Sequence, residues 1–283
     1  MEIIFSSLVI VVLISLCWGS FLGSFSYRIV FDMPIFTKRS YCPFCKNTIF
    51  WYDNVPLLSW ILLRGRCRKC ARPISAVYPF IELATTISIV GLWLKMFSLD
   101  TYTSTLKPYW AFFLPIFYES STLFSYAAFF SYAFFFSSLI AATASDLMTL
   151  MIPQIFSVWI IPVGVICSFL QLTQINYIES MVGSIFGYAI LWIVAFIFKK
   201  YMHKEGLGIG DMELLSMIGS FVGPIGVWIA LTLGSISGLV VGGFYLILAR
   251  KTKTTQIPFG PFLALGGILY VLFKHQLYSF FVF

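Results

Sequence analysis

The sequence has very few charged residues. Asp, Glu, Lys and Arg make up 10% of its 283 residues, whereas soluble domains carry about 25%. Hydrophobic residues make up 60%, and the mean hydropathy is +0.94. This composition excludes an ordinary soluble domain and predicts an integral membrane protein. The formal charge of +7 does not indicate a nucleic acid partner, because in a membrane protein an excess of Lys and Arg reports topology and contact with anionic lipid.

Several site signatures are also missing. The only two histidines, His203 and His275, fall in different predicted loops on opposite sides of the membrane, which disfavours a histidine metal site or catalytic triad. No phosphate-binding G-x-x-x-x-G-K-[ST] loop occurs, and no internal repeat is obvious, which disfavours an inverted-repeat transporter. The apolar run 3–25 lacks a preceding basic region and is long enough to span, so we expect a membrane helix there rather than a signal peptide.

Long apolar runs dominate the rest of the chain, and each is a candidate membrane span of about 20 residues. We predict an all-α polytopic protein with about eight transmembrane helices, at 3–26, 78–97, 122–145, 153–173, 180–198, 212–224, 226–249 and 260–280. The shorter run 108–118 is expected to be interfacial or re-entrant. Most Lys and Arg fall in 27–77, 199–211 and 250–257, which the positive-inside rule places in the cytosol together with 146–152.

Four cysteines lie in the predicted cytosolic loop, with the spacing C-x2-C-x21-C-x2-C: Cys42, Cys45, Cys67 and Cys70. This spacing is typical of a structural zinc site, which would stabilise a loop too small to bury much core. A redox pair or free thiols are the alternative, and disulfides are rare in the cytosol. We therefore predict a zinc-binding domain at 27–77, between a first helix at 1–26 and a membrane domain at 78–283. Cys17 and Cys167 are expected to be small buried hydrophobes.

Two carboxylates stand at the predicted cytosolic ends of apolar segments: Asp146 in "TASDLMTLMIP" and Asp211 in "GLGIGD". Carboxylates in or beside a membrane span are costly and indicate function. Two of them held together would share a proton, so that one activates water while the other polarises a carbonyl, as in aspartic proteases. Gly208 and Gly210 could let a substrate backbone approach closely. Asp211 as a plain helix cap, an ion-coupled transporter using both acids, and a thiol oxidoreductase remain alternatives.

These motifs together resemble the type IV prepilin peptidase family, the GxGD-type aspartic leader peptidases. The resemblance rests on the segments "GSFLGSFSYRIVFDMP" (19–34), 42–75, "YPFIELATT" (78–86), "SDLMTLMIP" (145–153), "GLGIGD" (206–211) and "IPFGPFLALGG" (257–267). The sequence departs from the family pattern at four positions. Gly23 stands where Asn is usual, Met148 where many members have a second acid, Gln154 where Asp or Asn is usual, and Glu213 where Lys is common.

The resemblance implies a bifunctional enzyme of the bacterial inner membrane. It would cleave the basic leader from type IV prepilins and type II secretion pseudopilins at the cytosolic face, using Asp146 and Asp211. It would then N-methylate the new N-terminus with S-adenosylmethionine. Gly65 and Glu82 are candidate methyl-donor residues, against the alternatives of a turn glycine and a structural carboxylate. Besides membrane lipid, the expected partners are these substrates, and the acids that could meet the basic leader are Asp32, Asp53, Glu205 and Glu213.

Overall fold

The computed structural model describes residues 2–35, 40–98, 121–202, 208–248 and 258–282, and the predicted interfacial run 108–118 lies outside them. The described residues contain helices and two isolated bridges but no strands, which confirms the all-α class. The chain divides into two compact units, Met1–Gly91 and Leu92–Phe283, and each is described by itself.

Unit 1 consists of two long helices and a loop domain between them. Its elements are α1 (Glu2–Val30), η1 (Trp51–Asn54), α2 (Leu58–Leu62) and most of α3 (Val77–Trp93). The two long helices approach closely at Gly19, where a Cβ atom would lie 2.8 Å from the Cα of Glu82. Small residues permit such contact between membrane helices, where dispersion replaces the hydrophobic effect.

Unit 2 is a helical bundle. Its elements are the end of α3, η2 (Leu94–Ser98), α5 (Ser121–Thr149), η4 (Gln154–Phe156), η5 (Val158–Ile160), α6 (Ile161–Phe169), α7 (Tyr177–Met202), α8 (Ile209–Leu248) and α9 (Gly260–Val282). Phe135 of α5 stacks on Phe221 of α8 at 4.4 Å between ring centroids, and both are fully buried. On the other side of α8, Ser184 and Ser216 hydrogen-bond at 2.9 Å. These contacts make α8 the centre of the bundle.

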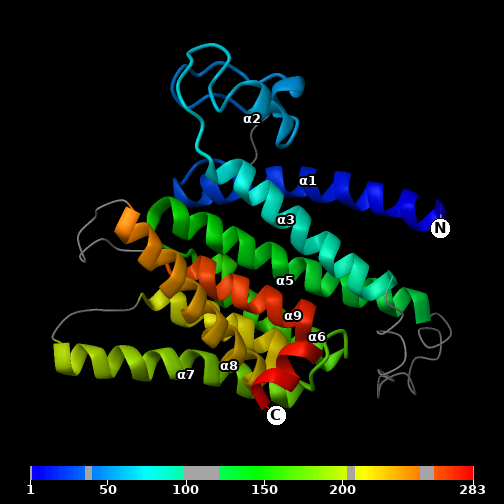
Figure 1. Cartoon of the computed structure of the whole chain (residues 1–283), viewed down its shortest axis with the longest axis vertical. Coiled ribbons are helices and arrows are strands. Elements are labelled where there is room, and N and C mark those ends of the chain that lie inside the picture. The colour runs from blue at the N-terminus through cyan, green and yellow to red at the C-terminus, as the bar shows by residue number, and fades with distance from the viewer. Residues whose placement is uncertain (1, 36–39, 99–120, 203–207, 249–257, 283) are drawn as a thin grey trace. The chain divides into compact units, whose positions relative to one another are not determined.

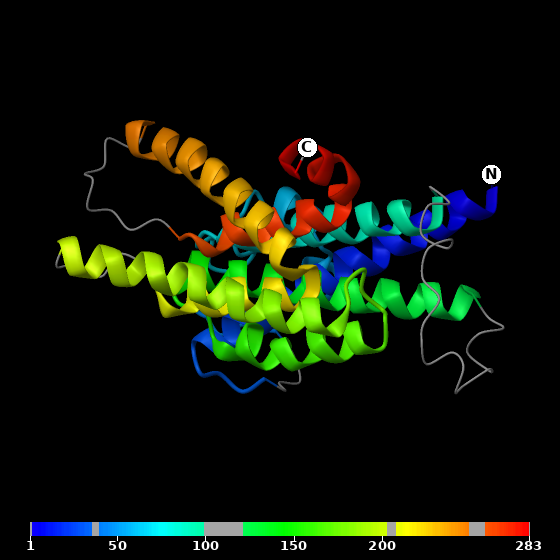
Figure 2. The same ribbon diagram turned by 90° about the horizontal axis from the view of Figure 1, so that it is seen from below.

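Helix α8 is broken in its middle. Gly223 has φ 75° and ψ 179°, a conformation that favours glycine, and Pro224 follows it. The break separates two limbs that correspond to the predicted segments 212–224 and 226–249. In Figures 1 and 2 the second limb runs back toward the side of unit 2 where α8 begins. Asp211, in the first turn of α8, lies at this end of the bundle.

Fewer helices meet the length and apolarity of a membrane span than the eight predicted. Five do so in the described residues: Ser7–Val30, Val77–Phe97, Leu123–Thr149, Tyr177–Tyr201 and Ile209–Phe244. The last contains two predicted spans. The predicted span 153–173 forms two 3-10 turns and the short α6, since Pro162, in the first turn of α6, has no N–H with which to continue a helix from the residues before it. In α9, the helix breaks at Phe273, and the polar residues 274–276 shorten its apolar run.

Candidate active site and metal centre

Asp146 and Asp211 lie close together in unit 2. Asp146 is in the last turn of α5 and Asp211 in the first turn of α8, and their carboxylates are near enough to interact electrostatically. Asp146 is buried, with 5% of its surface exposed, and Asp211 is half-buried. Figure 1 shows why they meet: α5 ends on the same side of unit 2 on which α8 and α9 begin.

Each carboxylate receives a hydrogen bond from a glycine backbone. The Gly260 N–H, at the start of α9, donates to Asp146 Oδ2 at 2.9 Å, and the Gly208 backbone bonds to the Asp211 carboxylate. Both acids therefore sit at a helix N-terminus, where backbone N–H groups and the helix dipole orient an anion. The fit at Gly260 is close, because a Cβ atom there would lie 2.8 Å from Asp146 Oδ2.

Ile152 holds the starts of α8 and α9 beside the two acids. A Cβ atom on Gly210 would lie 3.1 Å from Ile152 Cβ, and one on Gly260 would lie 3.1 Å from Ile152 Cδ1. Because both positions are glycine, the backbones at the starts of α8 and α9 can pack directly against Ile152, six residues after Asp146. The resulting pair of fixed carboxyl groups, one buried and one half-buried, can perform general acid–base chemistry on a bound peptide and water.

The four predicted cysteines come together in the loop domain of unit 1. Their sulfurs all lie within 4.8 Å of one another, and Cys42 Sγ is 3.9 Å from Cys70 Sγ. Two similar tight turns bring them there. The Lys46 N–H donates to the Cys42 carbonyl and the Ala71 N–H to the Cys67 carbonyl, both at 2.9 Å. The arrangement could hold one metal ion, as the cysteine spacing predicts.

The pKa values of Cys45 and Cys70 shift in opposite directions. A backbone hydrogen bond from Asn47 lowers the pKa of Cys45. At Cys70 the backbone of Arg72 also lowers the pKa, but desolvation and hydrogen bonds with the neighbouring thiols outweigh it and raise the pKa to about 11. Four thiolates this close repel one another, so a cation is needed for all of them to ionise together.

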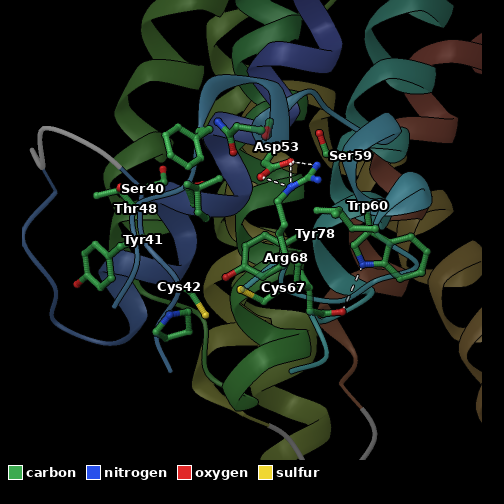
Figure 3. Close-up of a pocket in the computed structure, with 18 of the residues that line it drawn as sticks. Ser40, Tyr41, Cys42, Thr48, Asp53, Ser59, Trp60, Cys67, Arg68 and Tyr78 are labelled. Carbon is green, nitrogen blue, oxygen red and sulfur yellow. Dashed lines mark hydrogen bonds and ion pairs between the residues drawn. The ribbon is translucent and has the colours of Figure 1, made fainter. Parts of the chain in front are cut away.

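A cavity of about 260 Å³ lies beside the cysteine cluster, within unit 1. Figure 3 shows Asp53 and Arg68 facing each other in it, near Trp60 and Tyr78. The Arg68 guanidinium donates to both oxygens of Asp53, with Nη2 at 2.6 Å from Oδ1 and Nε at 2.8 Å from Oδ2. These hydrogen bonds raise the pKa of Arg68 further. The pair is therefore a fixed, charged part of the cavity wall.

Glu82 supplies a second carboxylate to this cavity. It is 8% exposed, and its Oε2 accepts the Leu57 N–H at 2.7 Å. Among the described residues Glu82 forms no ion pair, since Arg68–Asp53 is the one pair found there. The rings of Tyr27 and Tyr78 line the same space. Aromatic faces and an unpaired carboxylate together suit a ligand that carries a positive charge.

The remaining predicted residues have different surroundings. Gly65 does not line the cavity: it has φ 65°, and a Cβ atom there would lie 2.9 Å from the ring of Trp60, which does line it. Its geometry is that of a turn glycine. Of the acids expected to meet a leader, Asp53 is bonded to Arg68, and Glu205 lies outside the described residues, as does His203.

Sequence reasoning gave no role to Gly260 or to the Arg68–Asp53 pair. Gly260 stands in "IPFGPFLALGG", and a glycine before a proline at a helix start was the available signal. Nothing in the spacing of Asp53 and Arg68 shows that they meet, because that contact depends on how the cysteine turns fold the loop.

Comparison with known proteins identifies relatives of both units. Residues 13–96 match the family model described as bacterial peptidase A24 N-terminal domain, and residues 133–243 match the type IV leader peptidase family. The chain is 32% identical to the prepilin leader peptidase/N-methyltransferase of Aeromonas hydrophila, over 84% of this chain and 72% of the relative.

Two further relatives extend this comparison. A type 4 prepilin-like proteins leader peptide-processing enzyme from Escherichia coli is 32% identical, over 81% of this chain and 74% of the relative. A prepilin leader peptidase/N-methyltransferase from Pectobacterium carotovorum is 28% identical over 88% of each chain. No solved structure matches. The names of these relatives give no support to the transporter alternative.

Proposed function

The chain belongs to the type IV leader peptidase family, and on that premise we propose that it cleaves the leader peptide from prepilins and N-methylates the new N-terminus. The observation that carries the peptidase proposal is the meeting of Asp146 and Asp211 at the ends of two helices, each with a glycine backbone donor. We propose that type II secretion pseudopilins are substrates as well.

The two carboxyl groups suffice for peptide hydrolysis without a nucleophilic side chain. One carboxylate takes a proton from water, whose oxygen attacks the peptide carbonyl carbon. The protonated partner donates to the carbonyl oxygen as negative charge develops there. Collapse of the tetrahedral species, with proton transfer to the leaving nitrogen, breaks the C–N bond and releases the leader. Gly208 and Gly260 keep the two groups in a fixed orientation during these steps.

The proposed setting is the bacterial inner membrane, with the active site at the cytosolic face. Lys and Arg gather in the sequence segments 199–211 and 250–257, which directly precede or include the starts of α8 and α9. A prepilin that consists of a leader followed by an apolar helix would present its cleavage site at that interface. The membrane would therefore align the substrate with the two acids.

The metal proposed for the four cysteines is zinc. Four thiolates about 2.3 Å from a zinc ion lie about 3.8 Å from one another, and the 3.9 Å between the Cys42 and Cys70 sulfurs fits this. The ion would stabilise the loop domain, which has a short α2 and few buried side chains. Cys42, Cys45, Cys67 and Cys70 would hold it, and no catalytic step passes through it.

The cavity of unit 1 is the proposed methyl-donor site. S-adenosylmethionine would supply a methyl group on a positively charged sulfur. Tyr27 and Tyr78 would contact that charge with their ring faces, and the carboxylate of Glu82 would balance it. The volume of about 260 Å³ approaches the about 300–1,000 Å³ of small-molecule sites. Glu82 would also attract the substrate ammonium group and take up the proton that it releases.

One reconstitution tests the peptidase proposal. Purified enzyme is incubated with a synthetic prepilin and S-adenosylmethionine, and the mass and N-terminus of the product are read. We expect loss of the leader and a gain of one methyl group. Asp146→Asn and Asp211→Asn should each lower cleavage by about 10³-fold or more, because each removes an acid–base group. Either variant cleaving at the wild-type rate would contradict the mechanism.

A second measurement tests the methyl-donor site. Glu82→Gln keeps the size of the side chain and removes its charge, so binding of S-adenosylmethionine should weaken about tenfold, measured by calorimetry. Sinefungin, which has an ammonium group in place of the methylsulfonium, should lose as much affinity, whereas S-adenosylhomocysteine, whose sulfur is neutral, should lose little. Cleavage by Glu82→Gln should stay at the wild-type rate. Equal losses for ligands with and without a positive charge at this position would contradict the role of this carboxylate.

A further inference from the structure

Glu213 is an acid close to the Asp pair that the proposed chemistry does not use. It lies near the start of α8, two residues after Asp211. Gln154 Nε2 donates to its Oε1, and the Ser157 hydroxyl donates to its Oε2, both at 3.3 Å. Both donors are neutral, so they orient the carboxylate without cancelling its charge.

No cation balances Glu213 in the described part of the chain, where the single ion pair joins Arg68 and Asp53 in unit 1. Glu213 is half-buried and Gln154 is exposed, so the carboxylate lies where a ligand can reach it. A fixed anion that no cation balances is a binding site for a positively charged group.

The position of Glu213 defines how far from the scissile bond it acts. Residues two apart on a helix do not share a face, so Glu213 points away from the contact between Asp211 and Asp146. Two side chains on opposite sides of a helix end about 10 Å apart. An extended peptide covers that distance in about three residues.

We propose that Glu213 is a specificity-determining residue that binds a Lys or Arg side chain of the peptide substrate, about three residues before the bond that is cleaved. The inference rests on the proposed peptidase function and deepens it. Glu213 forms the ion pair in the bound substrate and in the transition state alike, so it lowers KM and leaves kcat unchanged. Gln154 and Ser157 are positioning residues for its carboxylate.

The experiment measures cleavage by the full-length, detergent-solubilised enzyme. The substrates are synthetic prepilins that differ only in one residue, Lys, Gln or Glu, placed in turn at the second, third and fourth positions before the scissile bond. For the wild-type enzyme we expect Lys→Gln at one of these positions to raise KM about five- to tenfold, and Lys→Glu to raise it further. The kcat should change by less than twofold.

The variants Glu213→Gln and Glu213→Lys complete the test. With Glu213→Gln the KM should no longer depend on substrate charge, and with Glu213→Lys the Glu substrate should become the best one. Glu179→Gln is the matched control. Glu179 accepts a hydrogen bond from the Asn176 N–H at the start of α7, at 3.0 Å. It lies beside Gly223, which is about 18 Å along α8 from Asp211.

Each outcome has a defined meaning. A wild-type KM that is the same for all three substrates at every position overturns the inference, whether or not the variants fold. A charge preference that persists in Glu213→Gln, or that Glu179→Gln also removes, overturns it as well. If the wild-type enzyme cleaves none of the substrates, the proposed function fails and the inference fails with it.

Discussion

The two units build their sites in opposite ways. In unit 1 the cysteine cluster comes from one loop, and its four ligands lie within 29 positions of each other in the sequence. In unit 2 the two acids and their glycine donor come from α5, α8 and α9, and Gly260 is 114 residues from Asp146. The first site depends on local turns, whereas the second depends on the packing of a whole helical bundle.

This difference predicts that the two sites fail independently. Removing a thiol unfolds the turns that wall the cavity of unit 1, but it leaves the contacts among α5, α8 and α9 untouched. A small change at a helix start in unit 2 moves a carboxylate by an ångström and leaves the loop intact. Each kind of change should therefore abolish one activity and preserve the other.

The largest effect is expected for Cys42→Ser. Cys42 is the most buried of the four thiols, with 7% of its surface exposed, and a hydroxyl is a poor zinc ligand. The purified variant should lose the metal, which we expect at about one zinc per chain in the wild type, and methylation of a pre-cleaved peptide should fall below detection. Metal content is read by mass spectrometry, and cleavage should remain within about threefold of wild type.

The matched control for this change is Cys17→Ser. Cys17 is also an unpaired cysteine of unit 1, but it lies on α1 away from the cluster and is exposed. It should keep the metal and both activities. If Cys42→Ser retained the metal, or if it lost cleavage and methylation equally, the independence of the two sites would be wrong.

The same comparison explains how much the sequence could predict. Each of the eight predicted spans overlaps a helix or helical turns in the described residues, because apolar runs depend on composition alone. The division between the predicted segments 212–224 and 226–249 agrees with the break at Gly223. The span 153–173 was harder, because a single residue such as Pro162 decides whether an apolar run stays one helix, and hydrophobic periodicity does not show this.

At the candidate sites, the spacing of residues in the sequence predicted only the group that comes from one short segment, the four cysteines. The interval between Cys45 and Cys67 is typical of a metal site, and the structure brings all four sulfurs together. Contacts between distant segments leave no spacing pattern in the sequence. Gly260 contacts Asp146, and Gln154 contacts Glu213, only when the helical bundle has assembled. Their residue types are ordinary for helix starts and loops, so only the structure gives them a role.

A smaller effect, confined to unit 2, is expected for Gly260→Ala. The added methyl group would lie 2.8 Å from Asp146 Oδ2 and 3.1 Å from Ile152 Cδ1, so the carboxylate must shift by several tenths of an ångström. Misplacement on this scale costs about 10²-fold in rate. We expect cleavage to fall by about that factor through kcat, with zinc content and methylation of a pre-cleaved peptide unchanged.

Gly267→Ala separates this geometry from a general effect of alanine on α9. A Cβ atom on Gly267 would meet only Ile218 side-chain atoms, at 3.5 Å, which is ordinary contact. Alanine also favours a helix more than glycine does. Cleavage by Gly267→Ala should therefore match wild type. A hundredfold loss in both variants would mean that α9 tolerates no substitution, whereas wild-type cleavage by Gly260→Ala would mean that the Asp146 carboxylate needs no close support from the start of α9.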